Sequence, residues 1–156
     1  MHDFWANVEG WRGFTAFNES LFLYPTVQGI HVLALGLAVG LLALADLRLA
    51  GLALTRLPAR TVLRSLRPWF VGGFGIVFTT GLLLFLAQAT RFYDKPLFWA
   101  KLVIIALAGL NALWFEVVTR RSTDEQQGVW SAKAAALTSL ALWTLVIILG
   151  RLLAYF

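Results

Sequence analysis

The chain has 156 residues and a formal net charge of +5, and 60% of its residues are hydrophobic while 13% are charged. Soluble domains carry about 25% charged residues, so this composition argues against a water-soluble fold and predicts a protein dissolved in lipid. The basic residues are spread between apolar runs, which argues against nucleic acid as a partner. The lack of cysteine excludes disulfides, thiolate catalysis and Cys-ligated metal centres.

Residues 1–20 form an aromatic segment with early acidic residues, Asp3 and Glu9, and do not resemble a cleavable signal peptide. Trp11, Phe14 and Phe17 recur about one helical turn apart. This pattern predicts a short amphipathic helix. Two positions are open for it: flat in the membrane interface, or packed against the outer mouth of the following helices.

Four apolar runs follow, and each supplies the roughly 20 residues that a helix needs to cross the hydrocarbon core. They are residues 21–45, 69–89, 97–119 and 132–155. Backbone polar groups inside a bilayer must bond within their own segment, so such runs become helices. The sequence therefore predicts an all-α, up-down four-helix transmembrane bundle as one domain over residues 21–156.

Arginines between the runs predict the orientation. The first loop, residues 46–68, and the third loop hold most of them: Arg48, Arg56, Arg60, Arg64 and Arg67 in the first, and Arg120 and Arg121 in the third. The positive-inside rule places these two loops in the cytoplasm and both termini on the outer side. Pro58 is expected to break or start a short helix in the first loop.

Small residues predict where the helices approach one another. Gly29, Gly36 and Ala43 recur every seven residues, and Gly36 and Gly40 have GxxxG spacing. Such positions let helix backbones pack closely in lipid. The partner helix is expected either in the same chain or in a second copy.

The first candidate site is His31, with Tyr24 and Gln28 on the same helix face because they lie seven and three residues before it. Ionisable residues inside a membrane mark functional sites by default. A histidine there can ligate haem or another metal, relay a proton or hydrogen-bond a quinone. The alternative is a structural histidine that is hydrogen-bonded to a hydroxyl or amide on another helix.

The second candidate is Lys101 with Asn111 on the third run. Lys101 either extends to the head groups or faces inward, where it would counter a haem propionate or a quinone carbonyl. Asn111 is expected to point at another helix as a packing contact. Polar residues on the other runs, Thr79, Thr80, Gln88, Ser139 and Thr144 among them, are weaker candidates.

The last candidate is Asp46 at the end of the first run, which is expected to pair with Arg67 or Arg120 as a charged latch. A cytoplasmic entry for protons is the alternative. No phosphate-binding glycine loop, GxSxG or HExxH motif occurs, so no catalytic residue is assigned and a non-enzymatic role is favoured.

One set of residues carries a resemblance that covers nearly the whole chain: Glu19, Ser20, Tyr24, Pro25, Gln28, His31, Gly36, Gly40, Asp46–Leu49, Pro58, Leu66–Trp69, Gly81, Leu84, Phe85, Lys101, Gly109–Ala112 and Phe115. This pattern resembles an uncharacterised family of bacterial four-helix membrane proteins. More loosely, the histidine followed by small residues is similar to copper-resistance membrane proteins and four-helix b-type cytochromes. The resemblance implies a multi-pass protein of the bacterial inner membrane. Those cytochromes hold haem through several histidines, whereas this chain has only His31 inside a run.

These observations predict a membrane module for binding or electron transfer, with its site in the outer half of the bundle. His31 is the expected axial ligand of a haem b or the hydrogen-bond partner of a quinone, with Tyr24, Gln28, Lys101 and Asn111 as further binding residues. The alternative is a structural or accessory subunit of a homodimer or larger membrane complex. The lipid bilayer is the expected environment in either case.

Overall fold

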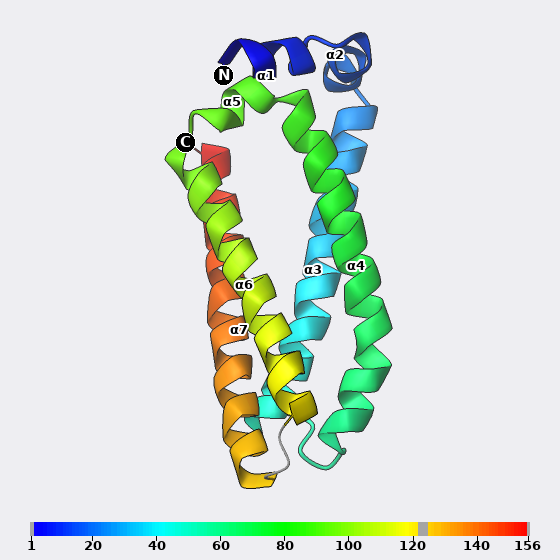
Figure 1. Cartoon of the computed structure of the whole chain (residues 1–156). Coiled ribbons are helices and arrows are strands. Elements are labelled where there is room, and N and C mark those ends of the chain that lie inside the picture. The colour runs from blue at the N-terminus through cyan, green and yellow to red at the C-terminus, as the bar shows by residue number, and fades with distance from the viewer. Residues whose placement is uncertain (1, 122–124, 156) are drawn as a thin grey trace. The chain divides into compact units, whose positions relative to one another are not determined.

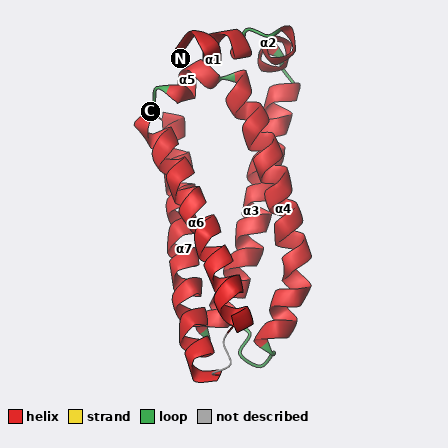
Figure 2. Ribbon diagram, in the orientation of Figure 1, coloured by secondary structure: helices red, strands yellow, loops and turns green. Residues whose placement is uncertain are grey.

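The computed structural model describes residues 2–121 and 125–155, and within these ranges all regular secondary structure is helical (Figure 2). The helices are α1 (His2–Glu9), α2 (Arg12–Glu19), α3 (Leu23–Ala50), α4 (Ala59–Ala87), α5 (Ala89–Tyr93), α6 (Pro96–Arg121) and α7 (Glu125–Tyr155) (Figure 1). The predicted all-α class is confirmed.

Four of these helices are long and apolar enough to cross a membrane: α3, α4, the Pro96–Phe115 part of α6 and the Trp130–Leu153 part of α7. Each of them overlaps one of the four predicted runs, although α4 begins ten residues before the predicted run. Many large hydrophobic side chains on them are exposed, for example Leu33, Phe78 and Leu110. Such a surface is stable only when lipid covers it. The chain is therefore a multi-pass membrane protein.

The first connection is much shorter than the predicted loop over residues 46–68, because α3 continues to Ala50 and α4 begins at Ala59, directly after Pro58. At the end of α3, Gly51 has φ +79°, its N–H bonds to the carbonyl of Arg48, and the N–H of Leu52 bonds to that of Leu47. These two bonds form a Schellman motif, in which glycine takes the left-handed conformation at lowest cost. The left-handed conformation of Gly51 thus ends α3 at Ala50, four residues beyond Asp46, the first charged residue of this helix.

Small side chains fill the contacts between helices. The buried residues are mostly alanines, namely Ala34, Ala38, Ala45, Ala87, Ala89, Ala108, Ala135 and Ala136. Gly73 is packed as well, since a Cβ added there would lie 2.9 Å from the Ala38 Cβ. By contrast, a Cβ added at Gly29, Gly36 or Gly40 would meet no atom of the described residues within 4 Å. The GxxxG pair therefore makes no helix contact within the described chain.

The chain divides into two compact units, residues 1–38 with 69–96 and residues 39–68 with 97–156. In the first unit, α1 packs against α5 (Figure 1). The Glu9 carboxylate accepts hydrogen bonds from the backbone N–H and hydroxyl of Thr90, at 2.9 and 2.5 Å, and the Gln88 amide donates to Asn18 at 3.0 Å. Of the two positions left open by the sequence, the N-terminal segment takes the one packed against the following helices.

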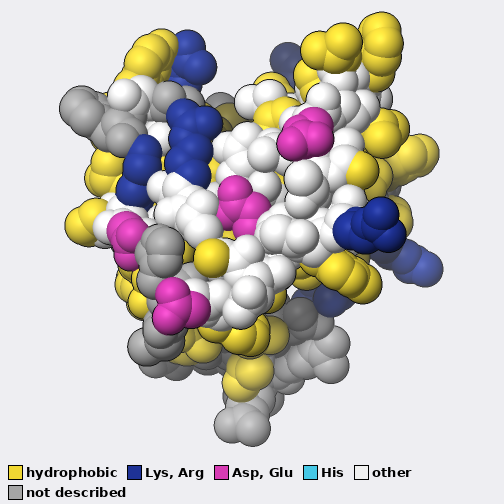
Figure 3. All heavy atoms as spheres, turned by 90° about the horizontal axis from the view of Figure 1, so that it is seen from above, with side chains coloured by type: hydrophobic (Ala, Val, Ile, Leu, Met, Phe, Trp, Pro, Cys, Tyr) yellow, Lys and Arg dark blue, Asp and Glu magenta, His cyan; other side chains and the backbone are white. Residues whose placement is uncertain are grey.

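Aromatic contacts also join α1 to α4 and α5. The Trp5 ring lies 5.2 Å from that of Phe85 and 6.1 Å from that of Tyr93, measured between centroids. Figure 3 looks at the molecule from above and shows acidic side chains among Lys and Arg side chains, with hydrophobic side chains around them. A segment that packs Trp5 against Phe85 and exposes Asp3 and Arg12 suits the boundary between membrane and water.

Candidate functional site

His31 lies on α3, in the first unit, and its half-buried imidazole faces α4. Its Nδ1 atom is 2.8 Å from the hydroxyl oxygen of Thr80. Thr80 has a single hydroxyl hydrogen, which it donates to the carbonyl of Ile76 at 2.7 Å. With the hydroxyl hydrogen donated to Ile76, the Thr80 oxygen accepts from Nδ1, and this assignment of the hydrogens makes Nδ1 the protonated ring nitrogen. If the ring is neutral, its lone pair then lies on Nε2.

Gly81 provides the space for the ring. A Cβ at this position would lie 3.1 Å from the Cε1 atom of His31 and 3.7 Å from its Nδ1. Ordinary carbon–carbon contacts begin at about 3.5 Å, so a larger residue would displace the imidazole. Thr80 and Gly81 together form a cradle in which one residue orients the ring and the other leaves room for it.

This arrangement matches the structural alternative raised from the sequence, a histidine bonded to a hydroxyl on another helix. Thr80 was one of several weaker polar candidates, and its pairing with His31 was not predicted. The nearest available signal was the run Thr79–Thr80–Gly81 on a helix that otherwise has long apolar stretches. Thr79 is exposed and bonds to the carbonyl of Gly75, while Thr80 is buried.

The other predicted residues of α3 lie apart from this cradle. Tyr24 is half-buried, and its ring packs 5.8 Å from that of Phe17 in α2. Gln28, one turn before His31, is exposed. Tyr24 thus packs against the N-terminal segment. Gln28 lies at the exposed surface of α3, one turn from the histidine. Their roles in binding stay predictions.

Lys101 and Asn111 lie on α6, in the second unit. The amide of Asn111 donates to the carbonyl of Ala135 on α7 at 2.9 Å, which confirms that it points at another helix. Lys101 is half-buried and turns toward α7, because a Cβ at Gly150 would lie 3.3 Å from its Nζ. The Lys101 side chain therefore lies against α7 in the second unit. Whether either residue binds a ligand stays a prediction.

Asp46 is the remaining candidate from the sequence, and Arg151 is a further charged residue near the end of α7. Arg151 is exposed, donates to the Tyr155 hydroxyl at 2.7 Å and lies over its ring. Asp46 is buried, and its partner is the hydroxyl of Ser139 on α7. The sequence instead predicted pairing with Arg67 or Arg120, and the side chain of Arg120 lies outside the described residues.

Within the described residues, no group of three or more His, Asp and Glu side chains is placed to hold a metal ion. A metal bound at His31 would take its further ligands from outside such a group, for example from a porphyrin or a second copy. Haem iron accepts this arrangement, because the porphyrin supplies four of its ligands and the protein one or two.

Residues 10–156 match the model of a family of unknown function, DUF6644. The chain belongs to this family. No curated protein and no solved structure matches it. The resemblance to an uncharacterised family is confirmed. The matched residues include His31, Thr80, Gly81 and all four apolar helices. The family description assigns no activity to them.

Proposed function

We propose that this protein is an integral membrane module for binding or electron transfer, in which His31 holds a haem b or a quinone. The supporting observation is the 2.8 Å contact between Nδ1 and the Thr80 hydroxyl oxygen. With Nδ1 as the donor, a neutral ring has its lone pair on Nε2. This is the atom that ligates haem iron or accepts a hydrogen bond from a quinol hydroxyl. Histidines bound to metals ordinarily donate their second ring N–H to a fixed acceptor.

The position of His31 suits an apolar ligand. The residues next to it on α3, Ile30 and Val32, are exposed hydrophobic side chains, and Gln28 lies one turn away at the same surface. A haem or a quinone carries a large apolar body and few polar groups, so it can approach such a surface from the lipid. His31 is the only histidine in the four apolar helices, and a single membrane histidine suits a five-coordinate haem, a haem shared between two copies, or a quinone.

The experiment is purification in mild detergent, followed by visible spectra of the oxidised and reduced protein and by solvent extraction of quinone. We expect the wild type to carry one of the two ligands and His31→Ala to lose it. Thr80→Val should lower the ligand content, whereas Thr79→Val, which removes the neighbouring exposed hydroxyl, should leave it unchanged. Absence of both ligands from the wild type, or equal content in His31→Ala, would refute the proposal.

A second candidate is a structural subunit that packs through α3 against another copy. It is favoured by the exposed Gly36 and Gly40, which have GxxxG spacing and no close neighbour in the described chain. Small residues at this spacing let two helix backbones approach closely. Gly36→Leu should convert an oligomer to a monomer in detergent, and Val71→Leu, on an exposed position of α4, should not. A wild-type monomer would exclude this role.

For the orientation, we propose that residues 51–58 lie in the cytoplasm and both termini on the outer side of the bacterial inner membrane. The support is Arg56 in this connection together with the arginines at the adjoining helix ends, Arg48, Arg60, Arg64 and Arg67, since Lys and Arg accumulate in cytoplasmic loops. Under this orientation, the His31 cradle lies in the outer half of the membrane and Asp46 in the inner half.

A further inference from the structure

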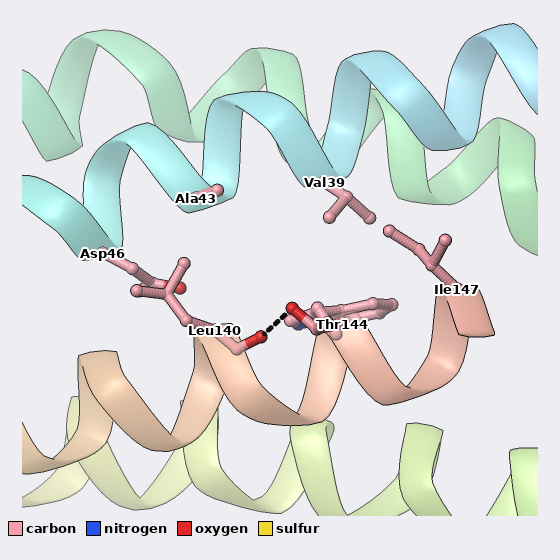
Figure 4. A pocket seen from close by; sticks show the side chains of 7 residues that line it. Val39, Ala43, Asp46, Leu140, Thr144 and Ile147 are labelled. Atoms are coloured by element: carbon pink, nitrogen blue, oxygen red, sulfur yellow. Dashed lines mark hydrogen bonds between the residues drawn. The ribbon is translucent and has the colours of Figure 1, made fainter. Parts of the chain in front are cut away.

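A small cavity in the second unit has a buried carboxylate in its wall. Its volume is about 50 Å³, and it lies between α3 and α7 (Figure 4). Its lining residues are Val39, Ala43, Asp46, Leu140, Trp143, Thr144 and Ile147. Asp46 is the only one of them with a titratable side chain, and the others are apolar or carry a single polar group.

Asp46 is 94% buried, since only 6% of its surface is exposed. The Ser139 hydroxyl bonds to its carboxylate, but the Oδ2 atom has no hydrogen-bond partner in the described chain. Arg48, the next basic residue along α3, donates through Nε to the carbonyl of Leu57 at 2.7 Å and so is directed to the connection. The carboxyl group therefore faces the cavity without a countercharge among the residues that line it.

An ionised carboxylate in such a place is very costly, because an unpaired charge in apolar surroundings loses the solvation of water. The neutral acid avoids this cost, but its hydroxyl must still find an acceptor. A cavity needs roughly 10–15 Å³ to hold a water molecule and must offer it two to four polar partners. Besides the Asp46 carboxyl group, the Thr144 hydroxyl is a second polar partner for such a water molecule. Its hydrogen is donated to the Leu140 carbonyl at 2.7 Å, so its oxygen can accept a hydrogen bond from the water.

We propose that Asp46 is a proton-binding site within the membrane, and that water in this cavity exchanges its proton. The Oδ2 atom carries the proton and donates it to a water molecule, which in turn donates to Thr144. Ser139 donates to the other carboxyl oxygen. A hydronium ion gives its proton to the carboxylate, which leaves the neutral acid and water. Release is the reverse step, in which water takes the proton as hydronium and the carboxylate keeps the negative charge. The site is independent of the ligand proposed at His31.

The experiment is infrared spectroscopy of the full chain in liposomes, compared with Asp46→Asn. We expect the wild type to show the carbonyl band of a protonated carboxylic acid, lost in the variant, and this band to shift promptly on transfer to D₂O. Ser139→Ala should move the band to higher frequency, because the carbonyl loses a donor, and should not remove it. Ala43→Leu, which fills the cavity, should slow the D₂O shift.

Two results would overturn the proposal. If the wild-type spectrum lacks the acid band, Asp46 is ionised and has a countercharge. If the band is present but does not respond to D₂O over hours, the cavity is dry and the proton does not exchange. Should Asp46→Asn fail to fold, Ser139→Ala still decides the assignment, because only an acid bonded to Ser139 changes its band in that variant.

Discussion

Alanine at Gly73 and alanine at the adjacent Gly72 should have different effects on stability, because only one of these glycines touches another helix. A Cβ at Gly73 would lie 2.9 Å from the Cβ and 3.4 Å from the Cα of Ala38, whereas a Cβ at Gly72 would meet nothing within 4 Å. Ordinary contacts begin at about 3.5 Å, so α3 and α4 must separate locally by about 0.6 Å.

The magnitude follows from two terms. Alanine is a better helix former than glycine by about 1 kcal/mol at either position, so this term cancels in the comparison. Overpacking typically costs about 1–3 kcal/mol, and one contact partner here is backbone and cannot rotate away. Gly73→Ala should therefore be less stable than Gly72→Ala by about 1–3 kcal/mol.

Reversible unfolding by SDS in mixed micelles, followed by circular dichroism, measures this difference. Wild type, Gly72→Ala and Gly73→Ala should share one unfolding slope and differ in midpoint. Equal midpoints for the two variants would refute the close approach of α3 and α4 at Gly73 and Ala38. They would also contradict the alignment of these two helices that places His31 beside Thr80.

Three further results are expected. Thr80→Val should lower the free energy of unfolding by about 1 kcal/mol, because the imidazole N–H loses its acceptor, and SDS unfolding measures it. Glu9→Ala should speed hydrogen exchange at the Thr90 amide, since that N–H loses its acceptor. In a chain without native cysteine, Thr55→Cys should resist a membrane-impermeant maleimide in intact cells, whereas Asp94→Cys should react.

Each of these results has its own control. Thr80→Ser retains the hydroxyl and should unfold like the wild type. If Glu9→Gln exchanges as fast as Glu9→Ala, the negative charge and not merely an acceptor holds the cap. Labelling of Thr55→Cys with protection of Asp94→Cys would reverse the proposed orientation.

The four membrane-crossing helices could be predicted because lipid imposes a strong constraint on length and composition. Their ends could not. Hydropathy falls at Asp46 and Arg48, yet the helical hydrogen bonds continue until Gly51 changes the backbone direction. Pro68 was expected in a loop, but it lies inside α4. Helix ends depend on local backbone geometry, which apolar runs do not report.

The hydrogen-bond partners of the polar residues could not be predicted from the sequence for a different reason. A helix turns by about 100° per residue, so the choice between Thr79 and Thr80 as partner of His31 depends on how two helices are rotated about their axes. The same holds for Asp46, for which charge suggested an arginine and α7 supplied Ser139. A single sequence identifies which side chains need a partner, and packing decides which one they find.

The measurement that tests the His31 account most directly is the ¹⁵N spectrum of histidine-labelled protein in lipid. The chain has two histidines, so a His2→Ala variant leaves the signals of His31 alone. We expect a neutral ring protonated on Nδ1, with an Nε2 signal that shifts when haem or quinone is added. A ring protonated on Nε2 would contradict the account, because its lone pair would then face Thr80 and no atom would remain to hold the ligand.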